Sequence, residues 1–100
     1  MPELDCTVRR VGDYESRTEE YEVHYALGDA APRRLRIKYQ AARAYEINAA
    51  LDAAATAARA VISEAGLEGP SEEALSKFTW RTLQAAKYEE GEPRSARLGL

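Results

Sequence analysis

The sequence predicts an α+β domain in which a three-stranded antiparallel β-meander is followed by two α-helices packed on one sheet face, in the order β-β-β-α-α. Three runs near the amino terminus alternate apolar with polar residues. Residues 41–65 then hold 12 of the chain's 19 alanines, and a second helical pattern starts after Ser71. One hundred residues suffice for one core without disulfides or metal ions. We expect a single domain over residues 1–90 and a mobile carboxy-terminal tail over residues 91–100.

The alternating runs place strands at residues 4–11, 21–27 and 34–40. Alternation with a period of two puts the apolar side chains of a strand on one face, so one sheet face should be buried and the other wet. Short connections favour antiparallel pairing in chain order. The residues expected on the buried face are Leu4, Cys6, Val8, Tyr21, Val23, Tyr25, Leu27, Leu35, Ile37 and Tyr39.

The alanine-rich segment predicts one helix with two apolar faces. A surface helix needs only one apolar stripe, so we expect this helix to be covered on both sides. The second helix of the same chain could cover the face of small residues, or the same helix of a second copy could do so across a two-fold axis. The face expected on the sheet carries Ala44, Ile47, Leu51, Ala54, Ala58, Val61, Ile62 and Ala65. The opposite face, the candidate homodimer contact, carries Ala49, Ala53, Thr56 and Ala60.

The second helix has clear boundary signals. Gly66 can end the first helix in the left-handed conformation, with Leu67 folding back on it. Ser71 is a favourable N-cap, followed by acidic residues that suit the positive end of a helix dipole. The helix should run to about Tyr88 and stop before Gly91. Its apolar stripe is formed by Leu75, Phe78, Thr79, Thr82, Leu83 and Ala86.

Composition and motifs argue against several functional classes. The net charge of −3 argues against a dedicated nucleic-acid binder, whose domain is usually strongly basic. Cys6 is the only cysteine, so neither an intrachain disulfide nor a thiolate zinc cluster can form. His24 has no sequence-near partner for a triad, and no phosphate loop or acidic metal motif is present. No apolar run could span a bilayer. We therefore expect a cytoplasmic, non-enzymatic protein without cofactor, metal or membrane contact.

Trp80 is the strongest candidate for a binding residue. It falls well off the apolar stripe of its helix, among basic and polar neighbours. An exposed tryptophan beside cations is typical of an interface anchor, because aromatic and arginine side chains dominate binding hot spots. The alternative is that the carboxy-terminal tail or the loop at residues 12–20 covers it, since tryptophan is highly buried on average. The candidate protein-binding residues are Trp80, Lys77, Arg81, Gln84, Lys87 and Tyr88.

A basic segment provides a second candidate site. Residues 30–45 contain five bases and no acid. If the third strand lies at the sheet edge, its outward cations could meet phosphates, or its backbone could accept a partner's strand. The alternative is a solvated face whose cations pair with Glu22 and Asp5 and guard the edge against aggregation. The candidate nucleic-acid-binding residues are Arg34, Arg36, Lys38 and Arg43.

Three strands followed by an alanine-rich helix, with Lys38 and Arg43 at its start, resemble the second half of a double-stranded-RNA-binding domain. The order is also similar to that of the arm-binding domains of tyrosine recombinases, which read DNA with the sheet. The resemblance covers residues 4–60 at most, and this chain lacks the leading helix and paired lysines of the RNA-binding domains. It assigns no family.

These features favour a small protein-interaction module that inhibits or regulates another macromolecular machine. Compact α+β domains of this kind occur among phage-encoded inhibitors of host machinery, including anti-CRISPR proteins, which is an analogy at the level of fold. The alternative function is nucleic-acid binding through the basic face of the third strand.

Overall fold

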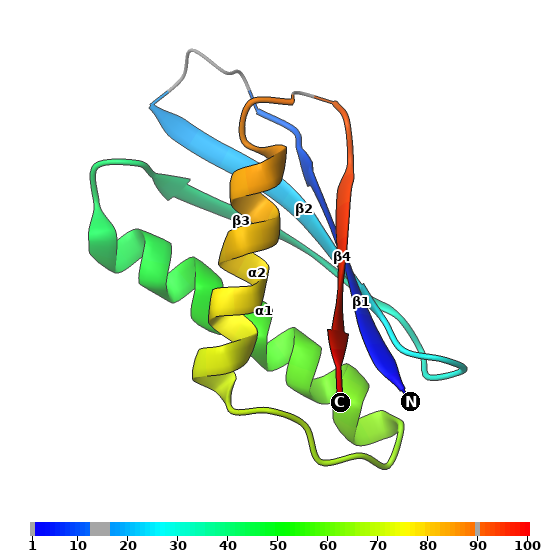
Figure 1. Cartoon of the computed structure of the whole chain (residues 1–100). Helices are drawn as coiled ribbons and strands as arrows, with labels where there is room; N and C mark the ends of the chain where they lie inside the picture. Colours follow the sequence, from blue (N-terminus) through cyan, green and yellow to red (C-terminus); the bar gives the residue numbers. More distant parts are fainter. Residues whose placement is uncertain (1, 13–16, 90) are drawn as a thin grey trace.

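The three strands predicted from the alternating runs form an antiparallel meander, and both predicted helices follow it (Figure 1). The expected α+β class and element order are thereby confirmed. The computed structural model describes residues 2–12, 17–89 and 91–100. The elements are β1 (Glu3–Arg10), β2 (Thr18–Ala26), β3 (Arg33–Gln40), α1 (Ala44–Glu64), α2 (Glu72–Ala86) and β4 (Arg94–Gly99).

The carboxy-terminal segment corrects the sequence prediction. Instead of a tail outside the domain, residues 94–99 form β4, which pairs antiparallel with β1. The sheet therefore has four strands in the order β3-β2-β1-β4. β4 has only two apolar residues, Ala96 and Leu98, and both pack partly against the core. Such a short, arginine-rich run predicts no strand by itself, and the open edge of β1 supplies the hydrogen-bond partners that order it.

The inward sheet face agrees with the alternation in the sequence. Cys6 lies opposite Tyr25 across β1 and β2, and Tyr21 lies opposite Ile37 across β2 and β3. All the predicted inward residues are buried except Leu35, which is partly exposed because β3 is an edge strand. These apolar residues form one continuous core with the helices.

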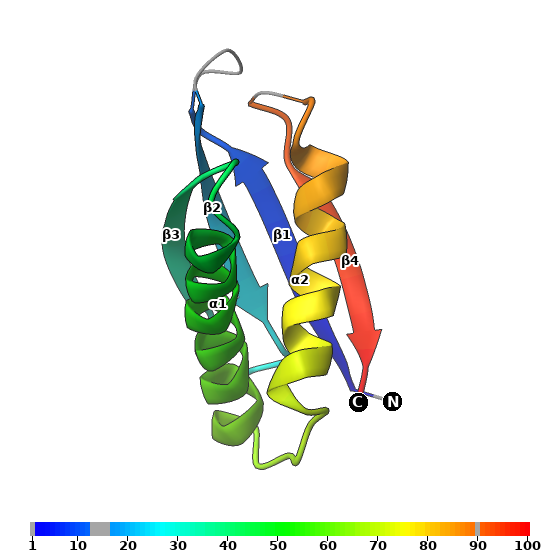
Figure 2. The same ribbon diagram turned by 90° about the vertical axis from the view of Figure 1, so that its left-hand side faces the viewer.

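Both helices lie on the same sheet face and run in opposite directions (Figure 2). The predicted stripe of α2 is buried in full, whereas the sheet-facing side of α1 is rotated from the prediction. Ile47 and Leu51 are only partly buried, and Ala44 and Ala65 are exposed. An alanine side chain is small, so α1 can lie close to the strands on an alanine-rich face. The buried residues of α1 are Ala50, Ala54, Ala55, Ala58, Val61 and Ile62.

The row of small residues on α1 is not covered by α2. Ala49, Ala53 and Thr56 are exposed and Ala60 is partly exposed. The expectation of a cover within the chain is therefore wrong, because α2 sits on the sheet beside α1 and both helices share one core. Cover by a second copy stays a prediction.

The connection between the helices holds them close together. Gly66 has a φ of 75°, and the Leu67 N–H donates to the Ile62 carbonyl at 3.2 Å, as predicted for the end of α1. A Cβ on Gly69 would lie 2.9 Å from the Ile62 Cδ1, so a larger residue would have to displace this buried side chain. Ser71 then accepts a hydrogen bond from the Ala74 N–H at 3.2 Å and caps α2.

Candidate protein-binding site

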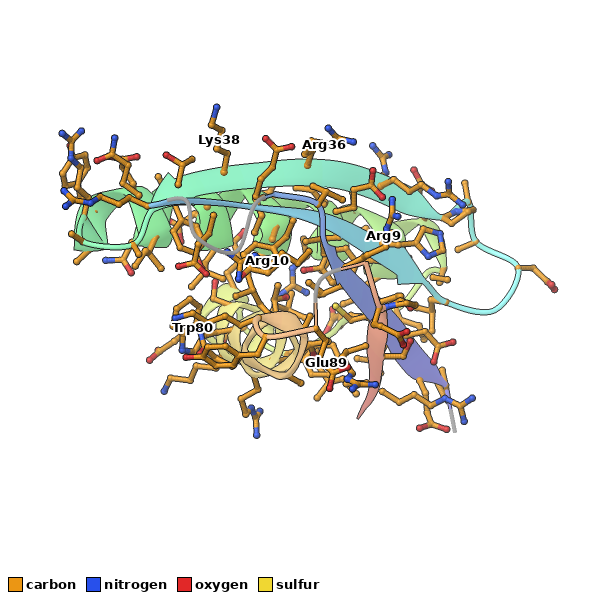
Figure 3. All side chains as sticks on the ribbon, turned by 90° about the horizontal axis from the view of Figure 1, so that it is seen from above. Arg9, Arg10, Arg36, Lys38, Trp80 and Glu89 are labelled. Carbon is orange, nitrogen blue, oxygen red and sulfur yellow. The ribbon has the colours of Figure 1, made fainter. Side chains whose placement is uncertain are left out.

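Trp80 lies on the flank of α2 and is partly buried (Figure 3). Its ring packs against the core, with its centroid 6.5 Å from that of Tyr39. β4 lies on the opposite side of α2, so the carboxy-terminal segment does not cover Trp80 as one alternative expected. Residues 13–16 of the other proposed cover, the loop at residues 12–20, lie outside the described residues. Trp80 therefore combines a fixed position with accessible aromatic surface.

Beside Trp80, a groove of about 340 Å³ lies between α1 and α2. Ile47 and Leu51 of α1 face Trp80 across it, and all three side chains keep exposed apolar surface. The sequence pattern predicts that Ile47 and Leu51 face the sheet, and they reach the groove because α1 is rotated relative to that prediction. Their partial exposure means that the groove has an apolar floor. The remaining lining residues are Ala44, Asn48, Glu73, Ser76 and Lys77.

Polar contacts define the rim of this groove. The Ser76 hydroxyl donates to the Leu51 carbonyl at 3.5 Å and links the two helices. Lys77 and Glu73 form an ion pair at 3.2 Å with highly exposed side chains. Such a pair contributes little to stability, so a partner's groups could replace either member at small cost.

The other predicted protein-binding residues do not gather around Trp80. Arg81 is exposed and lines a different groove, between α2 and β4. Gln84 is partly buried one turn beyond Trp80. Lys87 and Tyr88 follow the end of α2, with the Lys87 Nζ 5.5 Å from the Tyr88 ring centroid. Of the predicted set, the structure brings only Lys77 into the groove with Trp80.

Arg34, Arg36 and Lys38 lie on the outer sheet face. Figure 3 shows Arg36 and Lys38 pointing away from the helices. Arg36 forms ion pairs with Glu20 at 3.2 Å and Glu22 at 2.7 Å. Among the ion pairs of the described residues, none involves Arg34 or Lys38.

A hollow of about 550 Å³ on this outer face has lining residues of both charges, including Arg9, Glu22 and His24. Hydrogen bonds from Arg9 and Arg36 hold the pKa of the Glu22 carboxyl below its usual value, so this acid stays ionised inside the basic surface. Arg43 is not part of the outer face. It precedes α1 and pairs with Glu46 at 3.1 Å.

A buried polar cluster at one end of the core was not predicted. Arg10 and Glu19 are 2% and 4% exposed on the inward face of β1 and β2. The Tyr21 hydroxyl donates to the Glu19 Oε1 at 2.6 Å, and the Tyr21 ring stacks on Tyr39 with centroids 6.2 Å apart. Charged residues at strand ends usually indicate positions that are exposed to solvent. The signal that could have found them is the strand period, because Arg10 continues the inward series of β1 and Glu19 that of β2.

The described residues do not form a metal-binding cluster. They include no group of three histidine, cysteine or acidic side chains able to hold a metal ion. Burial raises the pKa of the Cys6 thiol to about 12, so the thiol stays protonated and is a poor nucleophile. Within the same parts of the chain, neither helix has the length and apolar character required to cross a membrane.

Comparison of the chain with known protein families, curated proteins and solved structures finds no match. The candidate site therefore rests on the geometry of this chain's own residues.

Proposed function

We propose that this protein is a non-enzymatic interaction module that binds another protein through the groove between α1 and α2. The observation that supports the proposal is the open apolar surface of Trp80, Ile47 and Leu51 in that groove. A tryptophan whose position is fixed by packing loses little side-chain freedom on binding, and tryptophan is the residue most enriched in binding hot spots.

The surroundings of the groove suit an apolar side chain or short helix of a partner. Protein interfaces combine an apolar centre with a polar rim, and Asn48, Ser76 and the Glu73–Lys77 pair provide such a rim. Both walls are helices packed on the same core, so binding requires no ordering of a loop. A domain that acts by occupying a partner's surface is suited to inhibition or regulation, and we propose that role.

Nucleic-acid binding through Arg34, Arg36, Lys38 and Arg43 is the less supported candidate. Arg36 and Arg43 already form ion pairs, and Glu20 and Glu22 lie on the same outer face as the cations. Acids on this face would repel phosphates and reduce the electrostatic gain on which nucleic-acid binding depends.

The groove is tested by affinity capture from the native host with the wild type and three variants. Trp80→Ala removes the anchor, and Asn48→Arg places a long cation on the rim of the groove without touching the core. Tyr88→Ala is the matched control, because Tyr88 is an aromatic residue that is 66% exposed outside the groove. We expect the wild type and Tyr88→Ala to capture the same protein and the two groove variants to lose it.

Circular dichroism and thermal unfolding of each variant separate lost binding from lost folding. If Trp80→Ala unfolds the domain, Asn48→Arg still tests the groove, because Asn48 is exposed and its replacement leaves the core intact. Equal capture by all folded forms would refute the groove as the binding site. Titration with duplex and single-stranded nucleic acid at low salt tests the second candidate, which requires an affinity that falls steeply with salt and is lost in Arg36→Glu.

A further inference from the structure

β4 presents a free backbone edge. It is the last strand of the sheet order, paired with β1 on one side only. The Leu100 N–H donates to the Pro2 carbonyl at 3.1 Å, in the same register as the β1–β4 ladder. Hydrogen-bonded pairs alternate along an antiparallel ladder, so Ser95, Arg97 and Gly99 direct their backbone groups away from β1. Within the described parts of the chain, no backbone hydrogen bond reaches this side of the three residues.

A groove of about 410 Å³ runs beside this edge, between β4 and α2. Phe78 and Leu98 contribute apolar surface to it. Its charged lining residues are all arginines, namely Arg81, Arg94 and Arg97. The lining of this groove therefore combines apolar surface with arginines and contains no acid, in contrast to the outer-face hollow, in which Glu22 accompanies the cations.

The three arginines are only loosely engaged within the chain. Arg97 pairs with Asp5 at 3.1 Å, but both side chains are at least half exposed. Arg94 pairs with Glu89, and each of these side chains is well exposed. Arg81 takes part in no ion pair among the described residues. Exposed ion pairs contribute little stability, so these cations can turn to a bound anion at small cost.

We propose that β4 accepts an extended acidic segment of a partner protein as a fifth strand of the sheet. Main-chain hydrogen bonds to Ser95, Arg97 and Gly99 would hold the segment, and its side chains would alternate between the two sheet faces. Arg94 lies on the helix face of β4 and Arg97 on the outer face, because their partners in β1 are Val8 and Asp5. Acids on both sides of the added strand therefore meet cations.

Other occupants fit this edge less well. A second copy pairing through its own β4 would bring arginines against arginines, and like charges across a strand pair are destabilising. Nucleic acid could contact the cations but carries no amide ladder for the free backbone groups. β3, the other edge strand, also carries cations on both faces, but its helix-face cation Arg33 pairs with Glu64 of α1, and the outer-face hollow beside it contains Glu22.

The proposal is tested by NMR titration at low salt with a blocked peptide as long as β4 that repeats valine-glutamate-glutamate, so that each face of the added strand carries acids. The same peptide with lysine in place of glutamate is the control. We expect saturable shifts centred on β4, slower amide exchange at Ser95, Arg97 and Gly99, and an affinity that falls with salt. The lysine peptide should not bind. Arg81→Glu should weaken the glutamate peptide about tenfold, since it removes one attraction and adds one repulsion.

Backbone pairing is tested at Ser95. Ser95→Pro removes the outward N–H and should abolish binding. Ser95→Ala keeps the N–H and loses only the hydroxyl hydrogen bond to Thr7 at 2.9 Å, so it should bind like the wild type. If Ser95→Pro does not fold, Arg81→Glu still tests binding of the acidic peptide, because Arg81 is exposed and its replacement leaves the core intact.

Absence of saturable shifts at β4, equal binding of the two peptides, or equal shifts with a short DNA duplex would overturn the proposal. Asn48→Arg, which alters the α1–α2 groove at an exposed position, should leave peptide binding unchanged, because Asn48 does not line the groove beside β4. Failure of the edge and failure of the α1–α2 groove are therefore distinguishable.

Discussion

The Arg10 Nη1 donates a 2.6 Å hydrogen bond to the backbone carbonyl of Lys87, which joins the end of β1 to the end of α2. The last carbonyls of a helix lack partners within the helix, and the helix dipole favours a positive charge there. The last turn of α2 contains no basic residue of its own. A strand far away in the sequence thus supplies the cation that completes this helix terminus.

Replacing Arg10 should therefore destabilise the domain strongly. Arg10→Met keeps a long apolar side chain but removes the donor, and we expect a loss of about 2–3 kcal/mol in the free energy of unfolding. Arg9→Met is the matched control, since Arg9 forms an exposed ion pair with Glu22 at 2.6 Å and should cost less than about 1 kcal/mol. Urea unfolding measures both. Equal losses of stability in the two variants would show that the buried hydrogen bond of Arg10 contributes no more than an exposed ion pair.

The two sides of α1 should respond differently to the same substitution. Ala58 has no exposed surface, so Ala58→Leu forces the core apart and should destabilise the protein by about 1–3 kcal/mol. Ala53 is exposed in the single chain, and Ala53→Leu should change stability by less than about 0.5 kcal/mol. The midpoints of urea unfolding of the two variants measure this difference in stability. A neutral Ala58→Leu would contradict the burial of this helix face.

The exposed row Ala49, Ala53, Thr56 and Ala60 retains the prediction of a two-fold homodimer. Small residues on both copies would let the two α1 backbones approach closely. Light scattering should then give twice the chain mass of 11.1 kDa, and Ala53→Arg should restore the single-chain mass. A wild-type mass of one chain at every concentration would exclude the homodimer.

Cys6 should be inert in the folded protein. Its side chain is fully buried and its thiol pKa is raised to about 12 by burial, so neither access nor thiolate is available near neutral pH. We expect a chromogenic disulfide reagent to react with Cys6 only at the rate of unfolding, and rapidly in denaturant. Fast labelling under native conditions would show that β1 opens locally.

Stability should fall in alkaline solution. Burial raises the pKa of Tyr39 to about 12 and raises the pKa values of Tyr21 and Tyr25 as well. The tyrosine pKa values in the folded state lie above the unfolded value of about 10. Their contribution to the free energy of unfolding is therefore complete below about pH 10 and is lost as the pH rises through the folded-state pKa values. Urea midpoints measured from about pH 8 to about pH 11 should decrease, with tyrosine ionisation seen by absorbance only as the chain unfolds. A constant midpoint would contradict the burial of the three hydroxyls.

The predictable parts of the fold are those in which one residue type repeats with the period of its element. Val8, Val23 and Ile37 face the core because each belongs to an alternating run, and the stripe from Leu75 to Ala86 on α2 is buried because its spacing matches a helix. Trp80 stood out as a binding candidate because it lies off that stripe. The sequence pattern places its partners in the groove, Ile47 and Leu51, on the sheet contact instead. Several rotations of an alanine-rich helix bury similar areas, so its own pattern does not select one.

The amino-acid sequence alone determined the α+β class, the strand faces, the end of α1, the start of α2 and the absence of an intrachain disulfide, since each follows from a local period, a cap or a composition. Tertiary structure decided the rest. It recruited Arg94–Gly99 as a strand, buried Arg10 against the end of α2, and placed Lys77 and Arg81 in two different grooves. These outcomes depend on partners distant in sequence: a short polar strand gains its hydrogen bonds, and a buried cation its carbonyl, only after the remaining elements have assembled.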